Sequence, residues 1–211
     1  MAASVVCGFT GRSKTNYQDR KDHKDLLFSF VSSCLCGEND QLSNGLNQLN
    51  SLLHAQAEAE FLKCCGSQRF ASAMTAARPF ANVDDLLTKA DSIWRSLRSE
   101  DWLEAFRAHP EIGEKKAAAA QSEEARKWSA QEQSGTQGAA ADTMAALAEG
   151  NRDYERRFGF IFIVCATGKS SEEMLAILQA RLQNDAETEI ATAAEEQRKI
   201  TRLRLEKLLQ Q

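Results

Sequence analysis

The stretch AETEIATAAEEQRKITRLRLEKLLQ, residues 186–210, decides the fold class, because its apolar residues recur at the spacing of one long helix. With Ile200 as the reference and about 100° per residue, Leu203 lies about 60° to one side, and Ala193 and Arg204 lie about 20–40° to the other. Arg204 therefore falls within the apolar face, where an unpaired guanidinium would be costly. Two partners fit it, an internal glutamate or the carboxylate of a ligand that Arg204 would clamp.

Helical patterns fill most of the remaining chain from about residue 45. The sequence has only two prolines and eleven glycines, and its abundant Ala, Glu, Gln, Lys and Leu favour helix. Asn82 and Ser170 stand where helix N-caps are expected, and Pro110 should end the helix before it. We therefore predict an all-α fold, a single compact multi-helix bundle domain over residues 45–211. Residues 1–44 are expected to form an N-terminal extension, either disordered or a leader.

Charge and hydropathy exclude two classes of partner. The net charge is −4 and no basic stripe is present, so no nucleic-acid partner is expected. No apolar run approaches the roughly 18 residues that a membrane span needs. The cysteines and His54 match no standard zinc spacing, so we predict no metal site and reduced thiols in an intracellular protein. These cysteines are Cys7, Cys34, Cys36, Cys64, Cys65 and Cys165.

The segment RFGFIFIVCATGKSSEEML, residues 157–175, ends like a phosphate-binding loop. Such a loop needs a glycine five positions before the Gly of Gly-Lys-Ser, so that backbone N–H groups can wrap a phosphate. That position is Ile163. Nucleotide binding is therefore disfavoured, and we interpret the run as a core element or the wall of another site.

Other polar residues do not fit a plain helical bundle. His109 stands at the end of an amphipathic helix beside Pro110, where a ring nitrogen could reach a ligand or simply cap the helix. Ser129, Glu132 and Gln133 lie about one turn apart on one side of a helix, which a Ser cap with a nearby acid would also explain. Together with Arg204 these residues could form a site for a small anion.

Four motifs in this order resemble the signatures of the OHCU decarboxylase family (2-oxo-4-hydroxy-4-carboxy-5-ureidoimidazoline decarboxylases), which act late in urate breakdown. They are HPEIG (109–113), SAQEQ (129–133), NRDYERRFGFIFIVCATGKS (151–170) and KITRLRL (199–205). The resemblance covers about residue 45 to the end. It is greatest to the plant and algal branch, in which the domain can be fused to a transthyretin-like hydroxyisourate hydrolase.

The resemblance implies a cofactor-free, all-α, usually homodimeric enzyme that decarboxylates an anionic ureidoimidazoline to (S)-allantoin. His109 would exchange a proton with the substrate's hydroxyl or its developing carbanion, and Glu132 would orient His109 or the ureido group. Arg204 would anchor an anionic group. The residues implied to bind substrate are Pro110, Ser129, Glu132, Gln133, Phe162, Ile163, Val164, Cys165 and Ala166.

Several features depart from the family pattern. Residues 1–44 lie outside it, and the stretch between His109 and Ser129 is slightly long, which could shift Glu132. We expect no hydrolase step in this chain, although a separate hydroxyisourate hydrolase could be its functional partner. The C-terminal LLQQ is no Ser-Lys-Leu signal, so a peroxisomal or cytoplasmic location stays open. The alternative function is a non-catalytic helical binding module of the same fold, against which the presence of His109, Glu132 and Arg204 argues.

Overall fold

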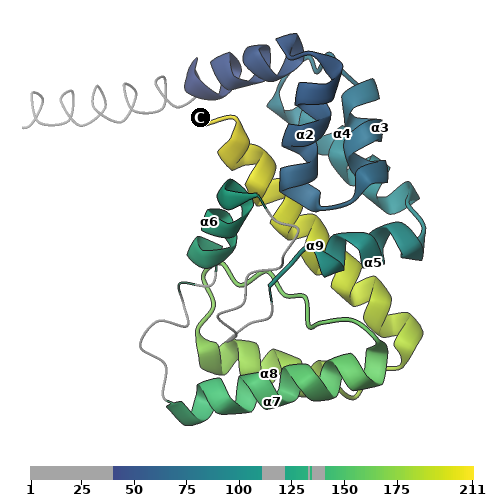
Figure 1. Cartoon of the computed structure of the whole chain (residues 1–211), viewed down its shortest axis with the longest axis vertical. Helices are drawn as coiled ribbons and strands as arrows, with labels where there is room; N and C mark the ends of the chain where they lie inside the picture. Colours follow the sequence, from purple (N-terminus) through teal and green to yellow (C-terminus); the bar gives the residue numbers. More distant parts are fainter. Residues whose placement is uncertain (1–39, 111–121, 133, 135–140) are drawn as a thin grey trace, which may run out of the picture. The chain divides into compact units, whose positions relative to one another are not determined.

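The computed structural model describes residues 40–110, 122–132, 134 and 141–211. In this part of the chain every regular secondary-structure element is a helix, which confirms the all-α prediction (Figure 1). A helix of residues 40–51 comes first. The others are α2 (His54–Cys65), α3 (Gln68–Ala76), α4 (Val83–Ser96), α5 (Ser99–Arg107), α6 (Glu123–Glu132), α7 (Ala141–Phe158), α8 (Ser171–Arg181) and α9 (Ala186–Leu208). None of the described helices is both long and apolar enough to span a bilayer.

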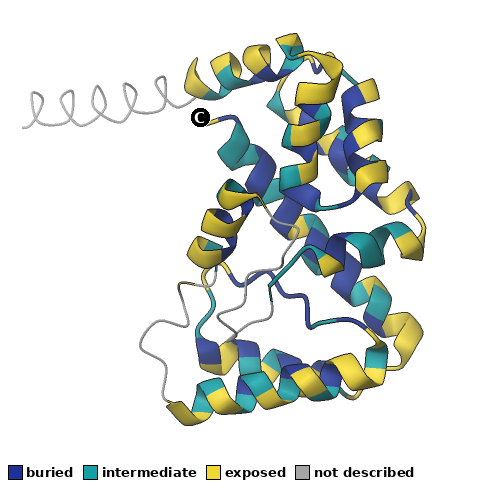
Figure 2. Ribbon diagram, in the orientation of Figure 1, coloured by how far each residue is buried: buried dark blue, intermediate teal, exposed yellow. Residues whose placement is uncertain are grey.

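The long helix α9 is the element on which the others pack, and it runs diagonally behind α6 and α5 in Figure 1. It contacts α2, α4 and α5, and the indole Nε1 of Trp94 in α4 donates to Ala194 O at 2.9 Å. Its buried stripe, dark blue in Figure 2, includes Ala193, Ile200 and Arg204. Arg204 is only 2% exposed, as the helical spacing predicts.

Predicted helix ends are confirmed at their caps. Asn82 Oδ1 accepts from Asp85 N at 2.8 Å and starts α4. Ser170 Oγ accepts from Glu173 N at 3.2 Å, and the Glu173 carboxylate accepts from Ser170 N at 2.7 Å, which completes a capping box for α8. Helix α5 ends at Arg107, shortly before Pro110.

The apolar run between α7 and α8 is an irregular segment, neither helix nor phosphate loop. Gly159 has φ 80° and Gly168 has φ 79°, left-handed conformations that glycine adopts without strain where the chain leaves α7 and approaches α8. Between them, residues 162–166 are buried. The Phe160 ring lies 5.2 Å from that of Phe106 in α5 and 5.6 Å from that of Tyr154 in α7, so aromatic packing holds the segment in the core.

The predicted boundary between residues 44 and 45 falls within the helix of residues 40–51. The chain divides into a unit Met1–Asp40 and a unit Gln41–Gln211, and the predictions for residues 1–39 lie outside the described residues. In the second unit, Gln41 Nε2 donates to Gln210 O at 2.9 Å, and Leu46 and Leu49 are buried. These residues therefore pack as part of the helical domain.

Gly45 provides a test of this packing. A Cβ at Gly45 would lie 2.0 Å from the backbone oxygen of Leu209, so Gly45→Ala must push the first helix away from the end of α9. We expect the free energy of unfolding, measured by urea denaturation, to fall by about 1–3 kcal/mol, as in other overpacked sites. The exposed helical neighbour provides the control, and Asn44→Ala should not lower stability. A Gly45→Ala variant as stable as Asn44→Ala would contradict this packing.

Candidate active site

A pocket lies where the end of α5, helix α6, the 160–167 segment and α9 meet. Its empty volume is about 450 Å³, including the part open to solvent. Its lining brings together residues that are far apart in the sequence: His109, Pro110, Ser129, Glu132, Phe162, Ile163, Val164, Ala166, Thr167, Ile200 and Leu203. Most of the predicted site residues are therefore in one place. Arg204 and Cys165 stand behind the wall, and Gln133 lies outside the described residues.

Glu132 and Arg204 form a buried ion pair at the α6 side of the pocket. The guanidinium donates from Nε to Glu132 Oε1 at 2.9 Å and from Nη2 to Glu132 Oε2 at 2.7 Å, a two-point contact. Nη2 also donates to Ser129 Oγ at 3.1 Å. Of the two partners that the sequence left open for Arg204, the structure shows the glutamate. Glu132 lines this pocket, whereas Arg204 lines a second hollow, together with residues of α2, α5 and α6.

His109 is half-buried, and its Nε2 is closed off from solvent without a hydrogen-bond partner among the described residues. Burial and, to a smaller extent, the positive charge of Arg204 lower the pKa of the imidazole to about 3, although the amide of Gln197 opposes both. His109 is therefore neutral at physiological pH in this structure. The sequence placed a ring nitrogen at a rim, whereas the structure encloses one nitrogen beneath the pocket.

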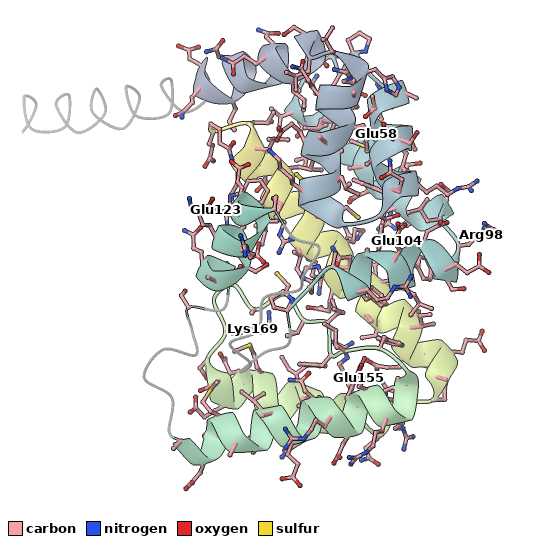
Figure 3. All side chains as sticks on the ribbon, in the orientation of Figure 1. Glu58, Arg98, Glu104, Glu123, Glu155 and Lys169 are labelled. Carbon is pink, nitrogen blue, oxygen red and sulfur yellow. The ribbon has the colours of Figure 1, made fainter. Side chains whose placement is uncertain are left out.

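Charged side chains hold the backbone of the pocket wall from behind. Arg181 donates from Nη1 to Ile163 O at 2.7 Å. At Cys165, Glu196 Oε2 accepts from the backbone N–H at 2.7 Å, and Lys169 Nζ donates to the carbonyl at 2.7 Å. Lys169 is labelled in Figure 3, on the stretch that leads into α8. The Ile163 carbonyl and both backbone groups of Cys165 are thus already engaged within the protein, and the neighbouring Phe162, Val164 and Ala166 line the pocket.

Arg181 belongs to a buried polar network that sequence reasoning missed. Its Nε donates to Glu189 Oε1 at 2.7 Å, and Asn184 Nδ2 donates to Glu189 Oε2 at 2.7 Å. The Tyr154 hydroxyl also donates to Glu189, and burial raises the pKa of Tyr154 so that this proton is retained. Helical spacing could have predicted the burial of Arg181, because Arg181 lies on the buried face of α8 with Met174 and Leu178, as Arg204 does on α9.

The described residues contain neither a thiol with a lowered pKa nor a cluster of metal-binding side chains. Cys64, Cys65 and Cys165 are buried free thiols, whereas Cys7, Cys34 and Cys36 lie outside the described residues. Desolvation raises the pKa of all three described thiols, that of Cys65 to about 12, so they are not thiolates at neutral pH. No cluster of metal-binding side chains occurs in the described ranges. The pocket instead offers a neutral imidazole and a fixed carboxylate, a set suited to proton transfer on a small polar ligand.

Comparison with known proteins identifies one family across the helical domain. The model of the OHCU decarboxylase family matches residues 50–206. The Arabidopsis thaliana uric acid degradation bifunctional protein TTL is 39% identical over 151 residues, covering 72% of this chain and 47% of that protein, so the chain spans about half of the plant relative. The Amia calva 2-oxo-4-hydroxy-4-carboxy-5-ureidoimidazoline decarboxylase is 33% identical, covering 78% of this chain and 94% of that enzyme.

Solved structures agree with the fold. A crystal structure of OHCU decarboxylase in the presence of (S)-allantoin superposes with a TM-score of 0.63 at 38% identity, covering 72% of this chain and 98% of that one. A crystal structure of (S)-allantoin synthase superposes with a TM-score of 0.58 at 20% identity and covers 77% of this chain and 53% of that one. The second likeness is one of fold alone.

Breaking the Arg181–Glu189 pair should destabilise the domain strongly. Arg181→Met leaves the carboxylate of Glu189 buried without its cation, which we expect to cost about 3–5 kcal/mol in urea unfolding. The double variant with Glu189→Met should recover part of this loss, because both buried charges are then gone while Ile163 O stays without its donor. The exposed Arg152→Met is the control. A double variant less stable than Arg181→Met would refute this account of the pair.

The depressed pKa of His109 makes stability depend on pH. The unfolded imidazole has a pKa near 6.5 and the folded one about 3, so below pH 6.5 the unfolded chain binds a proton that the folded chain does not. Stability due to this group is complete above pH 6.5 and declines as the pH falls toward 3, by at most about 1.4 kcal/mol per unit. Urea unfolding between about pH 7 and pH 5 should show a smaller decline for His109→Asn than for the wild type. Parallel declines would contradict the assignment.

Proposed function

Because this chain belongs to the OHCU decarboxylase family, we propose that it decarboxylates 2-oxo-4-hydroxy-4-carboxy-5-ureidoimidazoline to (S)-allantoin in urate degradation. One observation carries the proposal for this chain. His109, Glu132 and most residues of the 162–166 segment, which lie in three separate motifs, meet at a single pocket, and Arg204 of the fourth motif is hydrogen-bonded to Glu132. The substrate supplies its own electron sink, so the pocket needs to provide only orientation, charge and proton transfer.

The reaction balances with the groups at hand. The bond between the ring carbon and the carboxylate breaks, CO2 leaves, and the electron pair passes into the adjacent ring C=N. The ring nitrogen that receives this pair takes up a proton from solvent, and the hydroxyl proton is transferred to the neighbouring ring carbon, so that the C–OH becomes the carbonyl of neutral allantoin. His109 is the group that exchanges these protons. Its low pKa is raised when an anionic substrate binds beside it, because a nearby negative charge favours the imidazolium.

Glu132 and Arg204 have different roles in binding the substrate. Glu132 lines the pocket and can accept hydrogen bonds from the ureido N–H groups of the substrate. Arg204 holds Glu132 by two hydrogen bonds and places a positive charge next to a site that receives an anion. The extended 162–166 segment lies against the flat heterocycle, and protonation from one side in this enclosed site makes the product a single enantiomer.

The protein's functional partner, its oligomeric state and its location in the cell can also be proposed. The names of bifunctional uric acid degradation relatives support a functional pairing with hydroxyisourate hydrolase, whose product this enzyme would consume. A homodimer and a peroxisomal or cytoplasmic location are further expectations. A non-catalytic binding module of the same fold is the alternative, and the presence of His109 and Glu132 in one pocket favours the enzyme.

The activity can be tested in a coupled reaction followed by circular dichroism. Urate is converted freshly by urate oxidase and hydroxyisourate hydrolase, and the purified chain is added. We expect rapid formation of optically active (S)-allantoin, and a loss of about 10²–10⁴-fold in His109→Asn, the range for removal of a proton-transfer group. The matched control is His54→Asn, since His54 is 69% exposed on α2 and should not matter. Only slow, racemic allantoin from the folded wild type would instead support the binding module.

A further inference from the structure

We propose that Gln197 is a positioning residue that fixes the tautomer of His109, with Gln197 Oε1 accepting a hydrogen bond from Nε2–H. Nδ1 is then the ring nitrogen that presents a lone pair to the pocket. The inference deepens the proposed function and rests on it for its catalytic consequence. Its structural part, the location of one proton on one ring, can be measured without any turnover.

Two complementary atoms carry the inference. His109 Nε2 and Gln197 Oε1 are both enclosed, and neither completes a hydrogen bond with a described residue. Buried polar atoms without a partner are rare in folded proteins and call for an explanation. One of these atoms can carry a proton and the other can only accept one, so each supplies what the other lacks.

The orientation of the Gln197 amide is set by its other contacts. The Gln197 side chain is fully buried, and its Nε2 donates to Cys65 O at 3.5 Å and to Thr201 Oγ1 at 3.2 Å. A backbone carbonyl can only accept, so the NH2 group must be the one that faces Cys65. Oε1 therefore points to the other side and cannot be exchanged for a donor by an amide flip.

The position of Gln197 on α9 places it beside His109. Gln197, Ile200, Thr201 and Arg204 lie on one buried face of this helix, and Ile200 lines the same pocket as His109. The amide of Gln197 also acts directly on the imidazole, since it raises the pKa of His109 against the larger effect of burial. An acceptor beside Nε2 has this effect because it favours the form in which that nitrogen carries a proton.

The tautomer decides what His109 can do. A neutral imidazole has one N–H and one basic nitrogen. With the proton on Nε2, the basic Nδ1 is free to take a proton from the substrate. With the proton on Nδ1, the pocket would meet a donor and the basic atom would be enclosed. Gln197 thus acts through His109, as a carboxylate or carbonyl does when it selects the tautomer of a functional histidine.

The test is ¹⁵N NMR of the full chain labelled at histidine. The sequence has only three histidines, and the signals of His109 are identified by their loss in His109→Asn. Protonated and unprotonated ring nitrogens resonate far apart, so the tautomer is observed directly. In the wild type at neutral pH we expect the proton on Nε2. A proton on Nδ1 would overturn the proposal.

Gln197→Met removes the acceptor while keeping a side chain of similar shape. We expect the His109 proton to shift toward Nδ1 and kcat to fall by about 10–100-fold, as when a residue that orients a functional histidine is lost, with KM unchanged. Unchanged tautomer and unchanged kcat would refute the role of Gln197. The exposed Gln183→Met is the matched control and should alter neither.

Gln197→Glu distinguishes a hydrogen bond to His109 from a purely packing role of the Gln197 side chain. The carboxylate keeps an acceptor next to Nε2 and adds a negative charge, so His109 should carry protons on both nitrogens at a pH where the wild type is neutral. The other charged groups that face this site among the described residues are Arg204 of α9, which opposes that shift, and Glu132 of α6, which is already neutralised by Arg204. An unprotonated Nε2 in this variant would contradict the contact.

The two proposals can fail separately. If the wild type shows Nε2–H and Gln197→Met loses it, the positioning of the imidazole stands even where no allantoin forms, and only the decarboxylase proposal fails. If (S)-allantoin forms rapidly and Gln197→Met neither moves the proton nor slows the reaction, the decarboxylase proposal stands and the role of Gln197 is refuted.

Discussion

The ion pair between Arg181 and Glu189 is the constraint around which the site is arranged. Both charges are buried, and burying them is tolerable only if every donor and acceptor is satisfied. The partners come from different elements: Tyr154 from α7, Asn184 from the turn before α9, and the Ile163 carbonyl from the pocket wall. The pair therefore ties α7, α8 and α9 to the segment that lines the pocket, and the rings of Phe160 and Phe162 in that segment pack against the ring of Tyr154.

A second buried pair repeats this solution on the other side of the pocket. Arg204 joins α9 to α6 through Glu132, so the carboxylate that lines the pocket is held in one orientation before any ligand arrives. Glu196 and Lys169 do the same for the backbone of Cys165. Charges that are fixed in advance need not reorganise during the reaction, which is the main source of electrostatic catalysis in enclosed sites.

Part of this could be read from the sequence because it depends on local geometry. Helical spacing placed Arg204 on the buried face, and side-chain caps located the starts of α4 and α8. The partners of buried charges are set by long-range packing, so Glu189 and Glu196 gave no local sign, although the face argument would have found Arg181. The predicted boundary at residue 45 falls within the helix of residues 40–51, and the contact of Gln41 with Gln210, 169 residues later, is of a kind that no local pattern reveals.

His109 is a weak base in this structure, chiefly because it is buried. A pKa of about 3 keeps His109 neutral but disfavours proton uptake. An anionic substrate changes that balance, since its charge stabilises the imidazolium in a site where little water screens the interaction. In the proposed reaction, the substrate's own charge thus strengthens the base. CO2 leaves as a neutral molecule, so the negative charge stays on the ring until a proton neutralises it, and the low pKa of His109 then favours return of its proton to the product.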